Sequence, residues 1–470
     1  MTLGLRNQKN GFQPVNNVRL KIVLSRHLPP ARIFILSFAG VILLGALALW
    51  FPFSAAKGQL SFVDALFMST SGVCVTGLAT IDIGKDLSLI GQITTMILFQ
   101  IGGLGIITFS VFLFGIMGRG VSFKEREIIQ SVFMHTPRRD FLVILKSVLL
   151  FTLIIETVGA LLLFIRFSQD FPLGQALYTS VYHAISAFNN CGYSLFSDSL
   201  MGYRSDWIVN LTIMGLLILG GIGFIVLHEL MSWWKGSQKK VSVHTKIVLI
   251  TTGFLIVSGA ILFYFFESTY MVKDMDLSTS ILVSLFQGVS PRTCGFNTVD
   301  LALLTNEAIL LIMILMFIGA CPGSTGGGIK TTSAALLFLM IWNRFKGHDE
   351  VNVFNRTIPK EVLTRTISII IASAFSVALI TSVLLLAGGA NLPPAESRHL
   401  FVEYLFETIS AFGTVGLSMN VTPKLNEIQK IAVILMMFAG RVGPLTLAFS
   451  LAAASSKREI TYAEETVMVG

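Results

Sequence analysis

Charged side chains are scarce in this sequence. Only 13% of its 470 residues are Asp, Glu, Lys or Arg, whereas 53% are hydrophobic. A soluble domain carries about 25% charged residues, and a surface that faces water cannot be built from so few. Lipid must therefore cover much of the folded chain, which predicts a protein embedded in the lipid bilayer.

Cysteine is rare as well. The four cysteines, Cys74, Cys191, Cys294 and Cys321, are far apart and lie in apolar surroundings, so we expect no disulfide framework. Three of them, Cys74, Cys191 and Cys294, lie beside the glycines of a repeat described below, where a metal cluster is conceivable. The fourth repeat has Val415 where the second and third have cysteine, which favours small packing residues over metal ligands.

Signatures of catalysis are missing too. The apolar runs contain no HExxH, no GxSxG and no paired carboxylates, so we expect no enzyme, and a membrane enzyme is the weaker alternative. The formal charge of +8 is scattered along loops beside apolar runs, so we expect no nucleic-acid partner. The N-terminal residues have no apolar h-region, so we expect the first run to stay as a membrane anchor.

Eight apolar runs are long enough to cross a bilayer, which takes about 20 residues of helix. They are 33–50, 90–117, 141–164, 207–233, 247–266, 308–341, 367–387 and 428–454. If the N-terminus is cytoplasmic, 23 of the 34 Lys and Arg residues fall on the cytoplasmic side and nine, Arg292 among them, fall on the opposite side, while Lys330 and Arg441 lie within apolar runs. This bias predicts a multi-pass plasma-membrane protein with both termini in the cytoplasm.

Four short stretches between apolar runs resemble one another. Each starts with an aromatic residue, has a serine four positions later, and reaches a glycine five or six positions after that serine. The stretches are FMSTSGVCVTGL (67–78), YHAISAFNNCGY (182–193), FQGVSPRTCGF (286–296) and FETISAFGTVGL (406–417). Their serines are Ser71, Ser186, Ser290 and Ser410, and their glycines are Gly77, Gly192, Gly295 and Gly416.

A glycine-containing motif follows each stretch, 24 to 28 residues after its glycine. The motifs are GGLG, GGIG, GACPG and GRVG, and they begin at Gly102, Gly220, Gly319 and Gly440. We expect the first two to be packing glycines, because no strand–loop–helix context supports a phosphate loop. Two linked features that recur four times predict an all-α polytopic membrane protein of four tandem span–pore-helix–span repeats. It has eight transmembrane helices and four re-entrant P-loops around a central pore.

The Ser-to-Gly stretches are too short to be spanning helices. Non-helical backbone at membrane depth is tolerated only where protein surrounds it or water bathes it. Four such stretches around one axis would place carbonyl oxygens where they replace the hydration shell of a cation. Any one glycine alone would more often be a packing contact, but the fourfold recurrence favours an ion site. The candidate carbonyl donors to a monovalent cation are Val75, Thr76, Gly77, Asn190, Cys191, Gly192, Thr293, Cys294, Gly295, Thr414, Val415 and Gly416.

These residues resemble a known family, the Trk/Ktr/HKT superfamily of potassium and sodium transporters. The stretches GACPGSTGGGIKT (319–331) and AGRVGPLT (439–446) resemble more closely the bacterial Ktr membrane subunits (KtrB-like). The resemblance covers the chain from about Pro30 to the end. It implies that the four glycines line a selectivity filter. Sodium-selective plant relatives carry a serine at the first of these positions, so four glycines imply a preference for potassium.

The resemblance also implies a gating loop in the third repeat and an arginine below the filter in the fourth. Five glycines and Pro322 between 319 and 328 support the loop, because they would interrupt a helix. A simple kink is the alternative. We expect Arg441 to hold back cations or to bond to loop carbonyls. The expected gate residues are Gly323, Ser324, Thr325, Gly326, Gly327, Gly328, Lys330 and Arg441.

The resemblance further implies a homodimer with one pore per subunit. Its regulatory partner would be a cytoplasmic ring of nucleotide-binding subunits (KtrA-like) that bind ATP or ADP. The tail EITYAEETVMVG resembles the C-terminus that packs at the family's dimer interface. The expected segments are a cytoplasmic N-terminal segment (1–30), four repeats (31–120, 121–240, 241–350 with the gating loop, and 351–456) and a C-terminal tail (457–470).

The expected function is potassium-selective uptake across a bacterial plasma membrane, with K+ as the transported ion and no covalently bound cofactor. A sodium-permeable or sodium-coupled transporter, with Na+ as a stimulating ion, is the alternative within this class. An unrelated carrier with a site at the bilayer midplane is a third interpretation.

Overall fold

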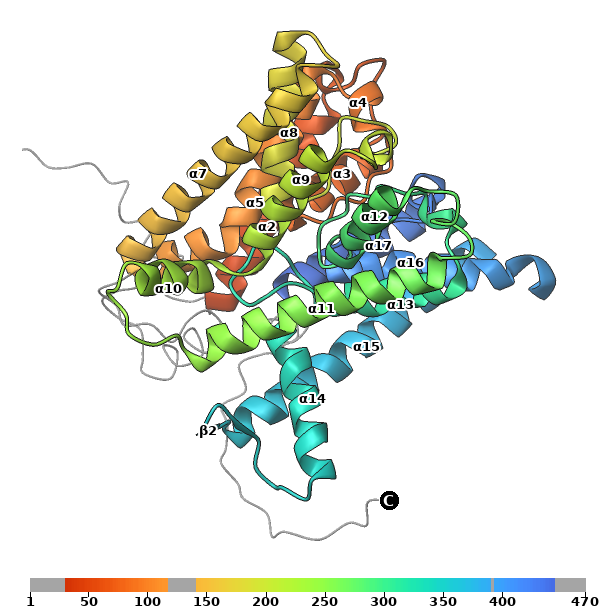
Figure 1. The fold of residues 1–470 in the computed structure, drawn as a ribbon. Coiled ribbons are helices and arrows are strands. Elements are labelled where there is room, and N and C mark those ends of the chain that lie inside the picture. Colours follow the sequence, from red (N-terminus) through yellow and green to blue (C-terminus); the bar gives the residue numbers. More distant parts are fainter. Residues whose placement is uncertain (1–29, 117–140, 390–392, 444–470) are drawn as a thin grey trace, which may run out of the picture.

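The computed structural model describes residues 30–116, 141–389 and 393–443, and these residues form helices joined by short connections (Figure 1). The helices that follow the predicted apolar runs are α2 (Pro30–Trp50), α5 (Leu89–Ile116), α7 (Phe141–Phe167), α9 (Trp207–Gly221), α10 (Phe224–Trp234), α11 (Val243–Glu267), α13 (Asn306–Phe317), α14 (Thr331–Phe345), α15 (Lys360–Gly389) and α17 (Glu427–Val442).

Shorter helices lie between them. They are α3 (Phe62–Cys74), α8 (Leu173–Phe188), α12 (Leu277–Val289) and α16 (Pro394–Gly413), with a single-turn helix α4 (Ile83–Asp86). The remaining elements are the 3₁₀ turns η1 (Pro52–Ser54), η2 (Met201–Tyr203), η3 (Leu301–Leu303) and η4 (Thr422–Lys424), and an antiparallel pair of strands, β1 (Asn352–Val353) and β2 (Arg356–Thr357).

Polar residues immediately before the apolar sequences start many of these helices. A side-chain oxygen at the N-cap accepts a hydrogen bond from a free backbone N–H of the first turn, which contributes about 1 kcal/mol. Asn426 and Gln429 form a reciprocal capping box at the start of α17. The N-cap residues that accept such a bond before α3, α9, α11, α12 and α13 are Ser61, Asp206, Ser242, Asp276 and Thr305.

The described helices include several membrane spans. By length and composition, three segments of the described chain can cross a bilayer, namely Lys146–Phe167, Val243–Glu267 and Lys360–Gly388. The bent pair α9–α10 raises this to four. The apolar parts of α2, α5 and α13 are shorter. The chain is therefore a multi-pass membrane protein, and the full number of eight spans stays a prediction.

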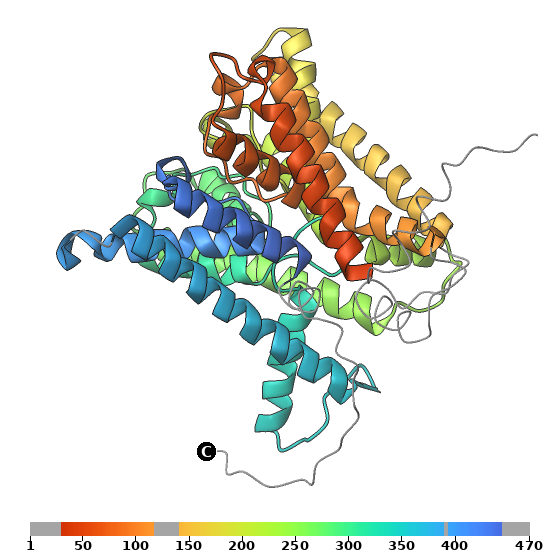
Figure 2. The ribbon, with the colours of Figure 1, turned by 180° about the vertical axis from the view of Figure 1, so that it is seen from behind.

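The packing of the short helices follows a regular order. Each short helix packs against the long helix that precedes it: α3 on α2, α8 on α7, α12 on α11, and α16 on α15. Successive units then meet through α5 and α8, α9 and α12, α13 and α16, and finally α17 and α3. The last contact returns to the first unit, so the order of contacts is cyclic. Figures 1 and 2 show α14 and the strand pair projecting from the rest.

Large apolar side chains cover the outside of the long helices. Leu44 on α2, Phe254 on α11 and Phe375 on α15 are each exposed to about two thirds of their area in the isolated chain (69%, 69% and 67%). Apolar patches of this extent are excluded from the surfaces of soluble monomers. Lipid contact accounts for them, as the scarcity of charge predicted.

Two predicted spans are interrupted. The run 207–233 was predicted as one span, and in the structure α9 and α10 meet there at an angle of 98°. Gly223 there has φ of 99°, and the N–H of Phe224 bonds to the carbonyl of Gly323 instead of to its own helix. A residue 100 positions away in sequence stabilises this break, so the local sequence does not predict it. The run 308–341 stops at Phe317 and resumes at Thr331, as its glycines indicated.

The packing of α9 gives a testable prediction. A Cβ at Gly220 would overlap the carbonyl oxygen of Phe188, whereas a Cβ at Gly215 in the same helix meets nothing within 4 Å. We expect Gly220→Ala to destabilise the protein by about 1–3 kcal/mol through overpacking. The matched control Gly215→Ala should be neutral or stabilising by up to about 1 kcal/mol, because alanine favours helix. Thermal unfolding in detergent measures both, and equal midpoints would contradict the packing described.

Candidate functional site

The four Ser-to-Gly stretches converge, although they are up to about 340 residues apart in sequence. A Cβ built on Gly77 would overlap the carbonyl oxygen of Cys191. One on Gly192 would overlap that of Cys294. A Cβ on Gly295 would lie 2.6 Å from the carbonyl oxygen of Val415.

The fourth contact returns to the first stretch, because a Cβ on Gly416 would overlap the carbonyl oxygen of Thr76. Each glycine thus faces a carbonyl of the next stretch in cyclic order. We call Gly77, Gly192, Gly295 and Gly416 the glycine ring. Any side chain at these positions would push a neighbouring carbonyl away.

The backbone of each stretch takes the same unusual conformation. The glycines of the ring have φ values of 92°, 80°, 79° and 93°. Two residues earlier the chain is also left-handed, at Val75 (φ 56°), Asn190 (58°), Thr293 (71°) and Thr414 (50°). Left-handed conformations are rare for β-branched residues such as Val75 and the two threonines. Strain of this kind persists only where surrounding structure enforces it and concentrates at functional sites.

The recurring serines tie each stretch to the helix before it. The hydroxyl of Ser71 accepts a hydrogen bond from the N–H of Gly77 (3.0 Å), and Ser410 accepts one from Gly416 (3.1 Å). In the other two stretches the hydroxyl donates instead. Ser186 donates to the carbonyl of Tyr193 (2.8 Å), and Ser290 donates to the carbonyl of Phe296. The recurrence of these serines was visible in the sequence, but their role was not.

The second set of glycines allows close packing behind the stretches. A Cβ on Gly102 would overlap the carbonyl oxygen of Val73, and one on Gly440 would overlap that of Phe412. Gly220 bears the same relation to Phe188. In three of the four units, therefore, the helix after a stretch touches the end of the short helix that carries it. These glycines are packing contacts, as expected for the first two.

The interrupted segment between α13 and α14 contacts three of the four stretches. The hydroxyl of Thr325 donates to the side-chain oxygen of Asn190 (3.0 Å). The N–H of Gly327 donates to the hydroxyl of Thr414 (2.8 Å). A Cβ on Gly326 would overlap the hydroxyl of Thr293. The three residues touched are the left-handed ones, so the segment lies directly against one end of the glycine ring.

Two cationic side chains bind this segment, buried Arg441 and half-buried Lys330. Arg441, which is 4% exposed, donates to the carbonyl oxygens of Thr325 and of Gly102 (2.5 Å for the second). The amine of Lys330 donates to the carbonyl oxygens of Gly326 (2.8 Å) and Gly327 (3.4 Å). Both expected roles of Arg441 are compatible with this geometry, because a residue bonded to loop carbonyls also places positive charge beside the ring.

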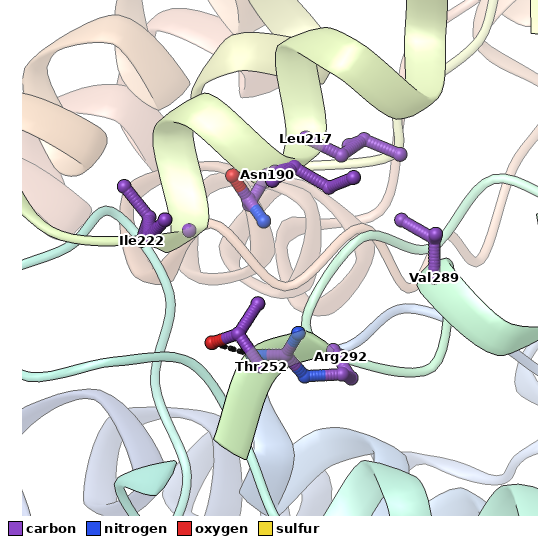
Figure 3. A pocket seen from close by; sticks show the side chains of 8 residues that line it. Asn190, Leu217, Ile222, Thr252, Val289 and Arg292 are labelled. Carbon is purple, nitrogen blue, oxygen red and sulfur yellow. Dashed lines mark hydrogen bonds between the residues drawn. The ribbon is translucent and has the colours of Figure 1, made fainter. Parts of the chain in front are cut away.

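A small cavity lies behind the second and third stretches. Its volume is about 10 Å³, enough for about one water molecule. Figure 3 shows Arg292 and Thr252 facing Asn190 across it, with a hydrogen bond of 3.4 Å from the Arg292 guanidinium to the Thr252 hydroxyl. Arg292 was counted among the charges on the side opposite the N-terminus, and its burial was not predicted: it is only 8% exposed, and a second weak bond reaches the sulfur of Cys321. This burial arises from its packing against α11 and the interrupted segment.

The glycine ring offers only uncharged oxygens to a ligand. No Asp or Glu lies within the four Ser-to-Gly stretches. In the described part of the chain, no group of three His, Cys, Asp or Glu residues could hold a metal ion. All four cysteines are free and buried there. Converging carbonyls without carboxylates suit a monovalent cation that is held briefly and released.

Fold and site together define a class: a multi-pass helical membrane protein in which four non-helical stretches meet beside an interrupted helix. A family model described as "TrkH: Cation transport protein" matches residues 32–459. The chain therefore belongs to the TrkH family of cation transport proteins.

Relatives are similar over nearly the whole chain. The identity is 37% with the Ktr system potassium uptake protein B of Vibrio alginolyticus, over 93% of this chain and 94% of that protein. It is 36% with the protein of the same name from Bacillus subtilis (96% and 99%) and 33% with the potassium/sodium uptake protein NtpJ of Enterococcus hirae (96% and 99%). The crystal structure of the potassium transporter TrkH from Vibrio parahaemolyticus matches with a TM-score of 0.67 at 20% identity, over 90% of this chain and 84% of that one, which shows a common fold.

Some expectations concern residues outside the described part of the chain. These are the N-terminal segment up to residue 29, the end of the 439–446 motif from residue 444, and the C-terminal tail. The repeat boundaries also stay a prediction.

The serine bonds give a prediction about ion preference. Ser71→Ala and Ser410→Ala each leave the N–H of a ring glycine without its partner, at a cost of about 1–3 kcal/mol. We expect each variant to discriminate less well among Na+, K+ and Rb+ in competition uptake by proteoliposomes. Ser258→Ala removes a hydroxyl that bonds to Phe254 on the outer face of α11 and should keep the wild-type order. Unchanged discrimination in both ring variants would show that these bonds do not determine the conformation of the stretches.

Proposed function

We propose that this chain takes up potassium across a bacterial plasma membrane, with the glycine ring as its selectivity filter. The observation that carries the proposal is the cyclic contact between each ring glycine and a carbonyl of the next stretch. Carbonyl oxygens that four stretches bring to one place can replace the water around a dehydrated cation. K+ gives up its water more readily than the smaller Na+, so a ring without carboxylates favours K+. Two relatives named as potassium uptake proteins support this choice.

The proposed filter has four re-entrant units, with Val75 to Gly77, Asn190 to Gly192, Thr293 to Gly295 and Thr414 to Gly416 as carbonyl donors. The cyclic packing of α3, α8, α12 and α16 supports a pore bounded by four span–pore-helix–span repeats. Uptake would follow the electrochemical gradient, since the membrane potential contributes about 2.3 kcal/mol per charge per 100 mV. The proposed transport requires no covalently bound cofactor.

The proposed gate is the segment Gly323 to Gly328 together with Lys330 and Arg441. Its contacts with Asn190 and Thr414 support this role, because cations leaving the ring on that side would meet the segment. Two fixed positive charges there would also repel them. Movement of the segment would require the bonds from Arg441 and Lys330 to break or shift.

The proposed assembly is a homodimer with both termini in the cytoplasm and a cytoplasmic nucleotide-binding ring as regulator. The relatives named as parts of a Ktr system support a multi-component transporter. Measuring the protein mass of the detergent-solubilised complex tests this assembly. A homodimer would have twice the 51.3 kDa of one chain.

The filter role is tested by Gly77→Ser. The new side chain would displace the carbonyl of Cys191 and occupy a left-handed position, which costs a residue with a side chain about 1–2 kcal/mol. We expect the preference for K+ over Na+ to fall roughly tenfold, the ratio that corresponds to about 1.4 kcal/mol. Proteoliposome flux in K+-only and Na+-only media measures it.

Gly253→Ser is the matched control, because Gly253 lies in α11 with nothing within 4 Å of a Cβ. Equal K+ and Na+ flux in the wild-type protein would end the selectivity proposal and favour the potassium/sodium transport that the name of the Enterococcus relative describes.

The gate role is tested by Arg441→Gln. Glutamine keeps an amide donor, but it lacks the charge and the paired guanidinium bonds to Thr325 and Gly102 that hold the segment against α5. We expect a several-fold rise in K+ flux by the purified chain without any regulatory partner. A change of this size corresponds to the free energy lost with one charge-assisted hydrogen bond. Arg166→Gln, which breaks an ion pair with Asp206 and Asp170, is the control and should leave flux unchanged. Unchanged or lower flux in folded Arg441→Gln would contradict the gate.

A further inference from the structure

A buried carboxylate has no part in the filter or gate described so far. Glu156 lies in the middle of α7 and is 8% exposed. An ionisable side chain within a membrane span is costly and rarely persists without a functional partner. We therefore infer the role of Glu156 from the residues that it contacts.

Glu156 belongs to a trio with Gln100 of α5 and Asn189, the residue that ends α8. The side-chain nitrogen of Asn189 donates to Glu156 Oε1 (3.1 Å) and to Gln100 Oε1 (2.5 Å). The side-chain nitrogen of Gln100 donates to Glu156 Oε2 (3.3 Å). Glu156 thus accepts from both amides, and Gln100 both donates and accepts. No single neutral amide at position 156 can accept both bonds with the same orientations.

The trio acts on the second stretch through Asn189. This residue immediately precedes left-handed Asn190 and then Cys191, whose carbonyl oxygen faces Gly77 in the ring. On its other side, a Cβ at Gly103 would lie 2.7 Å from Cγ of Asn189, so α5 packs tightly against it. Asn189 has little room to move unless its bonds to the trio change.

We propose that Glu156 is a positioning residue for the ion-binding ring: by fixing Asn189, jointly with Gln100, it sets where the carbonyl of Cys191 lies and thereby sets ion preference. This inference rests on the proposed filter function. Such a link is specific to the second unit, because the trio joins α5, α7 and α8.

Exchanging the side chains of Glu156 and Gln100 tests this proposal. In Glu156→Gln, one donor of the trio meets another donor, and in Gln100→Glu two carboxylates face each other. The double variant Glu156→Gln/Gln100→Glu restores all three bonds with the partners exchanged: Asn189 still donates to both side chains, and residue 156 donates to residue 100. Each protein is compared for the K+/Na+ flux ratio in proteoliposomes and for its thermal midpoint in detergent.

We expect each single variant to lower the K+/Na+ ratio by about tenfold, the change that corresponds to one lost charge-assisted hydrogen bond. The double variant should recover most of the wild-type ratio. Glu267→Gln is the control, because Glu267 is a fully buried carboxylate that bonds to Thr305 at the end of α11, away from the trio. It should keep the wild-type ratio even if its thermal midpoint falls.

Other outcomes overturn the proposal in distinguishable ways. If the singles lose stability but keep the ratio, the trio only holds helices together and the inference fails. If the double variant folds but does not recover most of the wild-type ratio, the bonds do not position the ring. This comparison needs only the wild-type protein, so it tests the trio even when the singles do not fold. If the wild-type chain itself does not prefer K+, the proposed filter fails and this inference fails with it.

Discussion

Every feature of the site follows from one constraint: main-chain polar groups at membrane depth must find partners other than lipid. The four stretches leave the helical conformation, so their N–H and C=O groups need other partners. Serine hydroxyls satisfy one group in each stretch, through Gly77, Gly416, Tyr193 and Phe296. Within the described part of the chain, the carbonyls that face the ring glycines accept no hydrogen bond, and in the proposed filter they would be available to an ion.

The same constraint couples the ring to the interrupted segment. Residues 319–329 also leave the helical conformation, and some of their partners are residues that shape the ring, namely Asn190 and Thr414. Arg441 joins this segment to α5 through Gly102, and Gly103 next to it packs on Asn189. A movement of the segment therefore cannot leave the ring undisturbed, since both use the same bonds.

The sequence predicted what depends on local pattern and missed what depends on distant partners. The scarcity of charge, the recurring Ser-to-Gly stretches and the glycines near Pro322 were enough to propose the class, the ring and the interrupted helix. The break at Gly223 was missed because a bond from Phe224 to distant Gly323 stabilises it, and the burial of Arg292 was missed because it arises from packing against α11. The trio of Gln100, Glu156 and Asn189 joins three helices, so no spacing in the sequence reveals it.

The most direct measurement is the ion density of the protein prepared in a heavier analogue of K+, such as Rb+ or Tl+, by anomalous diffraction. The account predicts peaks on the axis enclosed by the four ring glycines, coordinated by main-chain carbonyls from all four stretches. Density confined to another place, or stretches that bind ions through fewer than all four units, would contradict it.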